Sequence, residues 1–242
     1  MSAPDKTLST LSALLSFLYI VLYAYTPQLS LTFFDQRLYQ VFYGSLIKMS
    51  PIVIFSIITY KTKKTPEARY TSFALALSSV GDFLLDMELV QNSINGQYYF
   101  LAGLAFFLVA HLSYAIAFSQ HEIEHSLFRA SFFSLLPMVS MALHYSAIPS
   151  LQRPAIFFYS CVIAFMAYVA SSVNFLYNEK KRVFTLSGVF LFVLSDSFLA
   201  SDRFGSFIIP QSKLLVMLTY YSAQYLLMSA CILQDRENSK DV

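Results

Sequence analysis

Two long apolar stretches of this sequence each carry an aspartate in their interior. Asp82 lies in FALALSSVGDFLLDM, residues 73–87, and Asp196 lies in VFLFVLSDSFLA, residues 189–200. An isolated carboxylate near the middle of a membrane helix costs roughly 2.5–3.5 kcal/mol to insert, so such residues usually face the interior of a helix bundle and usually have a function. We therefore expect the two aspartates to meet and to form a site.

The spacing from the preceding basic residues supports this expectation. Asp82 follows Arg69 by 13 residues, and Asp196 follows Arg182 by 14. At the rise of an α-helix, both carboxylates lie about 20 Å from the same edge of the membrane. One intramembrane aspartate can be a packing residue, but two aspartates at one depth favour a shared site.

A lysine lies inside another apolar run. Lys48 is about ten residues from the end of its run by sequence, and an ammonium at that depth needs an anionic partner. Asp82, or Asp86 one helical turn further on, is the natural partner. The contact can be a purely structural ion pair, or Lys48 can tune a site carboxylate or bind a phosphate.

Two further pairs of polar residues share helix faces. His111 and Tyr114 are three residues apart in one apolar run, and Tyr221 and Gln224 are three apart in the last run, so each pair projects from one side of its helix. A lone histidine in an apolar helix more often makes a hydrogen bond than binds a metal, which needs several converging ligands. No metal is expected at this site.

One short motif suggests a different chemistry. Residues 121–125 read HEIEH, which matches the H-E-x-x-H pattern of zinc proteases. The motif stands at the polar end of an apolar run and has no evident third ligand. We interpret it as a solvated loop.

The elements that carry these residues are membrane helices. The chain of 242 residues is 57% hydrophobic and 12% charged, whereas soluble domains are about 25% charged. Its apolar residues form runs of about 20 residues, which is the length that spans a bilayer. The sequence therefore predicts an all-α polytopic membrane protein, one domain over residues 1–242 with eight transmembrane helices. The predicted spans are 8–25, 38–60, 70–87, 98–120, 128–147, 155–177, 183–201 and 214–233.

The basic residues orient this bundle. The side that holds the N-terminus carries eleven Lys and Arg residues and the opposite side carries four. Cytosolic loops are enriched in Lys and Arg. Both termini are therefore expected in the cytosol.

Five segments together resemble one known family. They are LIKMSP at 46–51, SSVGDFLL at 78–85, GLAFFLVAHLSYAIAF at 103–118, SGVFLFVLSDSFLASDRF at 187–204 and MLTYYSAQYL at 217–226. In this order they resemble the YhhN-like lysoplasmalogenase family, which includes animal transmembrane protein 86. The resemblance implies an eight-span ether hydrolase, in animals in the endoplasmic reticulum membrane. It would cleave the vinyl-ether bond of lysoplasmalogens to a fatty aldehyde and glycerophospho-ethanolamine or -choline.

The resemblance also implies roles for the polar residues. The motif aspartates, Asp82 and Asp196, would be the catalytic pair. A vinyl ether is acid-labile, so one carboxyl would protonate it while the other orients water and stabilises the cation, as two carboxylates do in glycosidases. The remaining candidates would surround the pair or contact the head group; they are Lys48, Asp86, His111, Tyr114, Tyr221 and Gln224.

The resemblance and the residues leave some partners and functions open. The expected partners are a lysophospholipid substrate and membrane lipid, with a homodimer as an open alternative and no nucleic acid, cofactor or metal. On residues alone, an intramembrane aspartyl protease is an alternative, because it also places one aspartate on each of two spans. A proton- or cation-coupled transporter, with the carboxylates as ion sites, is another.

Overall fold

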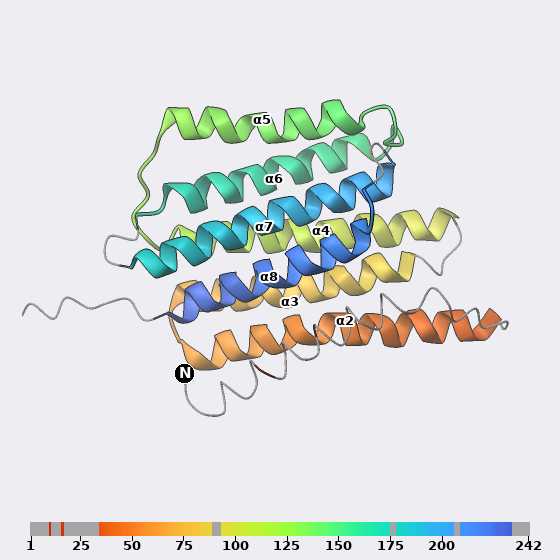
Figure 1. Ribbon diagram of the computed structural model, residues 1–242, viewed down its shortest axis with the longest axis horizontal. Helices are drawn as coiled ribbons and strands as arrows, with labels where there is room; N and C mark the ends of the chain where they lie inside the picture. The colour runs from red at the N-terminus through yellow and green to blue at the C-terminus, as the bar shows by residue number, and fades with distance from the viewer. Residues whose placement is uncertain are drawn as a thin grey trace, which may run out of the picture.

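Seven helices lie side by side in the described part of the chain (Figure 1). The computed structural model describes residues 34–88, 93–174, 178–205 and 209–233, together with Thr10 and Ser16. The helices are α2 (Phe34–Thr62), α3 (Pro66–Met87), α4 (Ser93–Phe118), α5 (Leu127–His144), α6 (Arg153–Ser172), α7 (Glu179–Phe204) and α8 (Ser212–Ile232). Among these residues the β-structure is limited to one isolated bridge between Ile123 and Val173, so the predicted all-α fold is confirmed there.

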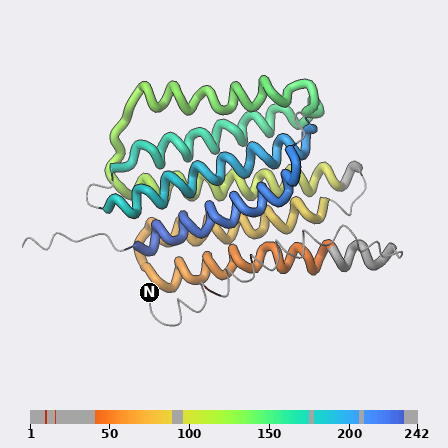
Figure 2. The backbone as a smooth tube through the Cα atoms, in the orientation of Figure 1, coloured from red at the N-terminus to blue at the C-terminus, as the bar shows by residue number. Residues whose placement is uncertain are grey.

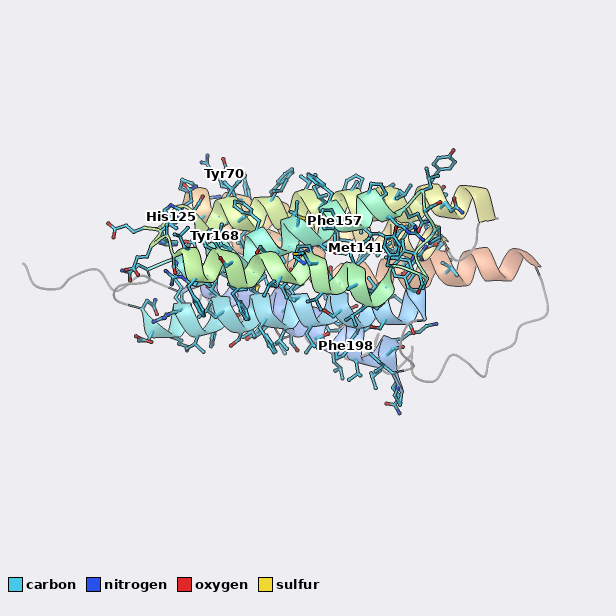
Figure 3. All side chains as sticks on the ribbon, turned by 90° about the horizontal axis from the view of Figure 1, so that it is seen from above. Tyr70, His125, Met141, Phe157, Tyr168 and Phe198 are labelled. Carbon is cyan, nitrogen blue, oxygen red and sulfur yellow. The ribbon has the colours of Figure 1, made fainter. Side chains whose placement is uncertain are left out.

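Six of these helices are long and apolar enough to cross a membrane: α2 and α4 to α8. Helix α3 has a suitable length of 22 residues but is less apolar, because it carries the carboxylates of the candidate site. The predicted first span, residues 8–25, lies outside the described residues apart from Thr10 and Ser16. Large apolar side chains project from the outside of the bundle, among them Phe157, which is 44% exposed (Figure 3). The chain is therefore a multi-pass integral membrane protein.

Five helices form a closed ring. Helix α3 packs against α4, α4 against α6, α6 against α7, α7 against α8, and α8 against α3. The other two described helices lie outside this ring: α2 covers α3 and α8, and α5 covers α6 and α7. Figure 2 shows α2 and α5 at opposite edges of the bundle. Side chains that point into the ring come together from segments far apart in the sequence.

Glycines let two pairs of ring helices approach closely. A Cβ atom on Gly81 of α3 would lie 2.6 Å from the ring of Phe107 on α4, and one on Gly188 of α7 would lie 2.9 Å from Leu227 on α8. Small residues at such contacts allow the close packing that holds membrane helices together. The glycine that precedes Asp82 therefore fixes the distance between α3 and α4 next to the candidate site.

Buried charges join the starts of α3 and α7. The Lys181 Nζ donates to Glu67 Oε2 at 2.9 Å, and both side chains are buried. Because both helices begin at this end, Asp82, 16 residues after Pro66, and Asp196, 17 residues after Glu179, lie at about the same height, roughly 25 Å from the helix starts. The depth match inferred from sequence spacing is thus present in the fold.

Candidate active site

Each helix of the ring contributes a polar side chain to the candidate site. They are Asp82 from α3, His111 from α4, Tyr159 from α6, Asp196 from α7 and Tyr220 from α8. Asp82, His111 and Tyr220 are almost completely buried, and the Asp196 side chain is 17% exposed. Buried polar groups are costly in an apolar surrounding unless they are hydrogen-bonded, and the contacts below provide those bonds.

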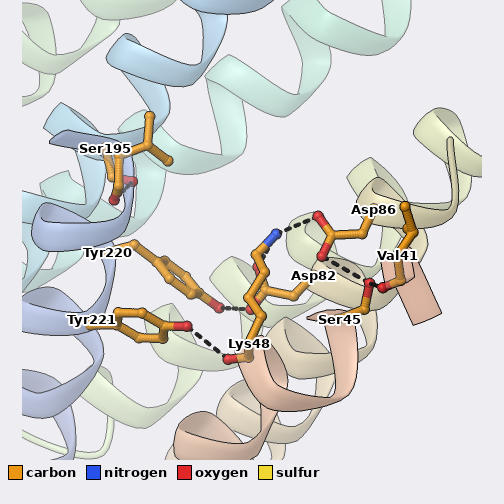
Figure 4. Close-up of polar contacts among 9 residues, drawn as sticks. Val41, Ser45, Lys48, Asp82, Asp86, Ser195, Tyr220 and Tyr221 are labelled. Atoms are coloured by element: carbon orange, nitrogen blue, oxygen red, sulfur yellow. Dashed lines mark hydrogen bonds and ion pairs between the residues drawn. The ribbon is translucent and has the colours of Figure 1, made fainter. Parts of the chain in front are cut away.

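Asp82 lies between a tyrosine and a lysine (Figure 4). The Tyr220 hydroxyl donates to Asp82 Oδ2 at 2.7 Å. The Lys48 Nζ, which comes from α2 outside the ring, lies 3.7 Å from Asp82 Oδ1. This second distance is too long for a hydrogen bond, so the lysine acts on Asp82 mainly through its charge.

Asp86 is the closer partner of the lysine. The Lys48 Nζ donates to Asp86 Oδ1 at 2.8 Å (Figure 4). The Ser45 hydroxyl lies 2.9 Å from Asp86 Oδ2 and 2.7 Å from the Val41 carbonyl oxygen, and these two oxygens share its one proton. The Tyr221 hydroxyl donates to the backbone carbonyl of Lys48 at 2.9 Å, which ties α8 to α2. The structure therefore places Lys48 against both carboxylates of α3, with the shorter contact to Asp86.

Asp196 has a different set of partners. The Tyr159 hydroxyl donates to Asp196 Oδ2 at 2.7 Å. The His111 Nε2 lies 3.0 Å from the same hydroxyl oxygen and 3.6 Å from Asp196 Oδ2. The candidate histidine thus contacts the second aspartate and not the first. Each aspartate accepts one short hydrogen bond from a tyrosine. In the part of the chain that the structure describes, a lysine lies beside Asp82 but not beside Asp196.

Aromatic rings pack against the side chains that contact the two aspartates. The ring of Phe192 lies 4.8 Å from that of His111 and 5.6 Å from that of Tyr220, centroid to centroid. The ring of Phe107 lies 6.1 Å from that of Tyr220. No hydrogen bond links the two carboxylates among the described residues. The expectation that the two aspartates meet stays a prediction, because each carboxylate has its own partners.

Tyr114 and Gln224 form a separate buried contact behind the site. The Tyr114 hydroxyl donates to Gln224 Oε1 at 2.5 Å, and both side chains are fully buried. The Tyr114 ring is 6.4 Å from that of Phe192, so the pair supports a ring that lines the site. Within the described part of the chain, neither side chain is hydrogen-bonded to an aspartate, so both residues support the site from behind and do not contact the pair.

Sequence reasoning missed three residues that touch the carboxylates. Tyr220 lies four residues before Gln224, on the same helix face, and that spacing could have pointed to it. Ser45 lies one turn before Lys48 in the same way. Tyr159 belongs to a helix without a resemblance segment, and tyrosines in membrane helices are often packing or interface residues, so its sequence context gave no signal.

The HEIEH segment does not form a zinc-protease helix. Residues 121–126 lie outside the helices, and each histidine has its own partner. The His121 Nε2 lies 3.2 Å from Glu67 Oε2, whereas the His125 Nδ1 lies 3.0 Å from the Tyr168 hydroxyl (Figure 3). Two histidines held apart in this way cannot act as the paired ligands of that motif, in agreement with a loop.

Comparison with known proteins places these residues in one family. The YhhN family model matches residues 43–231, a range that includes every residue of the site described above. Lysoplasmalogenase TMEM86A of Bos taurus is 29% identical over 179 residues, which cover 73% of this chain and 70% of the relative. Lysoplasmalogenase TMEM86B of Sus scrofa is 30% identical over 188 residues, covering 76% and 73%. The comparison with solved structures finds no match. The chain belongs to the YhhN family.

Proposed function

We propose that this protein is a lysoplasmalogenase, a hydrolase of the vinyl-ether bond of 1-alkenyl lysophospholipids with ethanolamine or choline head groups. The products would be a fatty aldehyde and a glycerophospho-base. The family match supports the proposal. It is also supported by relatives named lysoplasmalogenase, to which this chain is similar over most of their length. The observation that carries it is the placement of Asp82 and Asp196 in one ring interior, each bonded to a tyrosine.

This interior suits the chemistry of a vinyl ether. Protonation of the β-carbon gives an oxocarbenium ion, water adds to it, and the hemiacetal collapses to aldehyde and alcohol. The reaction needs an acid and a carboxylate that faces the cation, the arrangement that glycosidases use for a similar ion. His111 contacts a tyrosine and a carboxylate and so is not paired with a serine or cysteine nucleophile. General acid–base catalysis by the aspartates is therefore the mechanism that these contacts favour.

The membrane arrangement is part of the proposal. The chain spans the bilayer eight times, with α3 and the segment of residues 8–25 added to the six apolar helices, and both termini are cytosolic. The excess of Lys and Arg on the N-terminal side supports this orientation. The protein acts in the endoplasmic reticulum membrane, where it contacts membrane lipid and binds its lysophospholipid substrate.

The assay of purified protein with two lipids tests the proposal. The protein should release aldehyde from 1-alkenyl lysophosphatidylethanolamine and should leave its acyl counterpart intact. Asp82→Asn and Asp196→Asn should abolish release while expression and insertion persist. Asp202→Asn is the matched control and should keep its activity. Asp202 lies on the same helix as Asp196 but at the helix end, where it accepts a hydrogen bond from the Ser212 hydroxyl. Full turnover by Asp196→Asn, or no product from either lipid, would contradict the proposal, and the second result would direct attention to ion transport.

A further inference from the structure

We infer that Asp82 is the general acid of the catalytic pair and that Asp196 is its ionised partner. The reason is that Lys48 forms its short ion pair with Asp86, so Asp82 has no closely paired cation among the described residues and keeps its proton. The inference rests on the proposed function and deepens it by assigning the two carboxyl groups different tasks. Lys48 and Asp86 are then positioning residues that act through Asp82. Three observations support it: the charge balance around Asp82, the distances of Lys48 and the exposure of Asp196.

The first observation is a shortage of positive charge around Asp82. Among the described residues, the charged and titratable groups near it are Lys48 from α2, Asp86 from α3, Tyr220 from α8 and Tyr159 from α6, and a neutral tyrosine adds no positive charge. Helix α4, which also packs against α3, presents Phe107 at this level, and its histidine contacts Asp196 instead. One ammonium can balance one carboxylate, and a second buried anion without a partner is strongly unfavourable. One of the two carboxyl groups of α3 therefore keeps a proton.

The second observation shows which group keeps it. Asp86 is the carboxylate that pairs with the lysine, because its Oδ1 accepts a short charge-assisted bond from Lys48 at 2.8 Å. Asp82 lies 3.7 Å from the same ammonium. A charge-assisted bond at the shorter distance is much stronger than a contact at the longer one. The proton therefore belongs on Asp82, the carboxyl group that the resemblance places in the catalytic pair.

The third observation concerns the partner. The Asp196 side chain is 17% exposed, whereas that of Asp82 is 4% exposed. Asp196 accepts a bond from Tyr159 and lies 3.6 Å from a ring nitrogen of His111. A carboxylate that accepts a hydrogen bond from a tyrosine and is less deeply buried than Asp82 is the better suited of the two to remain ionised and to take a proton from water.

The assignment gives a balanced proton path. Asp82 transfers its proton to the β-carbon, and a C–H bond forms while Lys48, 3.7 Å away, stabilises the new carboxylate. Water then bonds to the cationic carbon and gives a proton to Asp196, which yields the hemiacetal. In the collapse, Asp82 takes the hemiacetal hydroxyl proton, Asp196 returns its proton to the ether oxygen, and the C–O bond breaks. Both carboxyl groups end as they began, and one water has been consumed.

Difference infrared spectroscopy of the purified protein tests the assignment without turnover. At neutral pH the protein should show the carbonyl stretch of a protonated carboxylic acid. Asp82→Asn should remove this band, and Asp196→Asn should leave it in place. A band that survives in Asp82→Asn and disappears in Asp196→Asn would overturn the assignment. A band assigned to Asp82 in a protein that releases no aldehyde would instead count against the proposed function alone.

The pH profile of Asp86→Asn tests the part played by the lysine. Without the carboxylate of Asp86, Lys48 pairs with Asp82 and favours its ionised form, so the acid is lost at lower pH. The alkaline limb of the kcat profile should shift to lower pH by about one unit or more, which is a tenfold change in the protonated fraction of Asp82 at a given pH on that limb. Asp86→Glu should restore the profile. A profile of Asp86→Asn with unchanged limbs would overturn this role.

Discussion

Replacement of Tyr159 by phenylalanine is a sharp test of the role given to Asp196. The change keeps the aromatic ring, including its packing against His111 at 5.4 Å, and deletes only the hydroxyl that donates to Asp196 at 2.7 Å. A hydrogen bond to a charged group contributes about 1.5–3 kcal/mol. Because each 1.36 kcal/mol changes a rate about tenfold, kcat should fall roughly ten- to a hundredfold.

The size of the loss in kcat depends on His111, the partner that Asp196 keeps in this variant. His111 Nε2 is 3.6 Å from the carboxylate and would move closer only if the ring shifts. Because Tyr159 touches the aspartate and is not proposed to touch lipid, KM should change little. The assay is aldehyde release over a range of vinyl-ether lipid concentrations.

Tyr168→Phe is the matched control for this change. Tyr168 lies on the same helix α6, and its hydroxyl contacts His125 in the loop at the end of the bundle. This variant should retain the parent kcat. Parent-like turnover by Tyr159→Phe, in protein that folds and inserts normally, would refute the argument that Asp196 depends on its hydrogen bond.

Three further changes probe the framework around the site. Lys48→Met should destabilise the protein by about 3–5 kcal/mol, because it leaves the Asp86 carboxylate without its cation; a melting temperature in detergent equal to that of the parent would contradict this. Gly81→Ala should lower the free energy of unfolding by about 1–3 kcal/mol through overpacking, since the new Cβ would lie 2.6 Å from the ring of Phe107. Unchanged thermal stability would contradict this, because it would show that α4 can move away without cost. Lys181→Met should lower the melting temperature by breaking the buried pair with Glu67 and leave kcat of the folded protein unchanged; a loss of kcat at full stability would connect this distant pair to the reaction.

Sequence reasoning reached the carboxylates but not their surroundings. A lone aspartate in an apolar run is conspicuous because charge in a membrane is costly, and this cost made Asp82 and Asp196 visible. Tyr159 and Tyr220 carry no such signal. Their role depends on which helices are neighbours, and the closed ring in which α3 meets α8 and α6 meets α7 comes from packing that no local pattern records.

The choice of partner by Lys48 shows a second limit. Asp82 and Asp86 are one turn apart on the same helix, so both were within reach of the lysine and the sequence favoured neither. The distances of 3.7 and 2.8 Å depend on the relative height of α2 and α3 and on the hydroxyl of Ser45. A difference of less than 1 Å in helix position, which periodicity cannot resolve, underlies the assignment of acid and base.

Hydrolysis of 1-alkenyl lysophosphatidylethanolamine in water labelled with oxygen-18 tests the central claim most directly. If the vinyl ether is protonated and water adds to the cationic alkenyl carbon, the aldehyde, trapped by reduction as it forms, carries the label and the glycerophospho-base does not. Asp82→Asn should form no such product. Label in the glycerophospho-base would show that the bond between the glycerol carbon and the ether oxygen is cleaved, and the acid–carboxylate account of this site would be wrong.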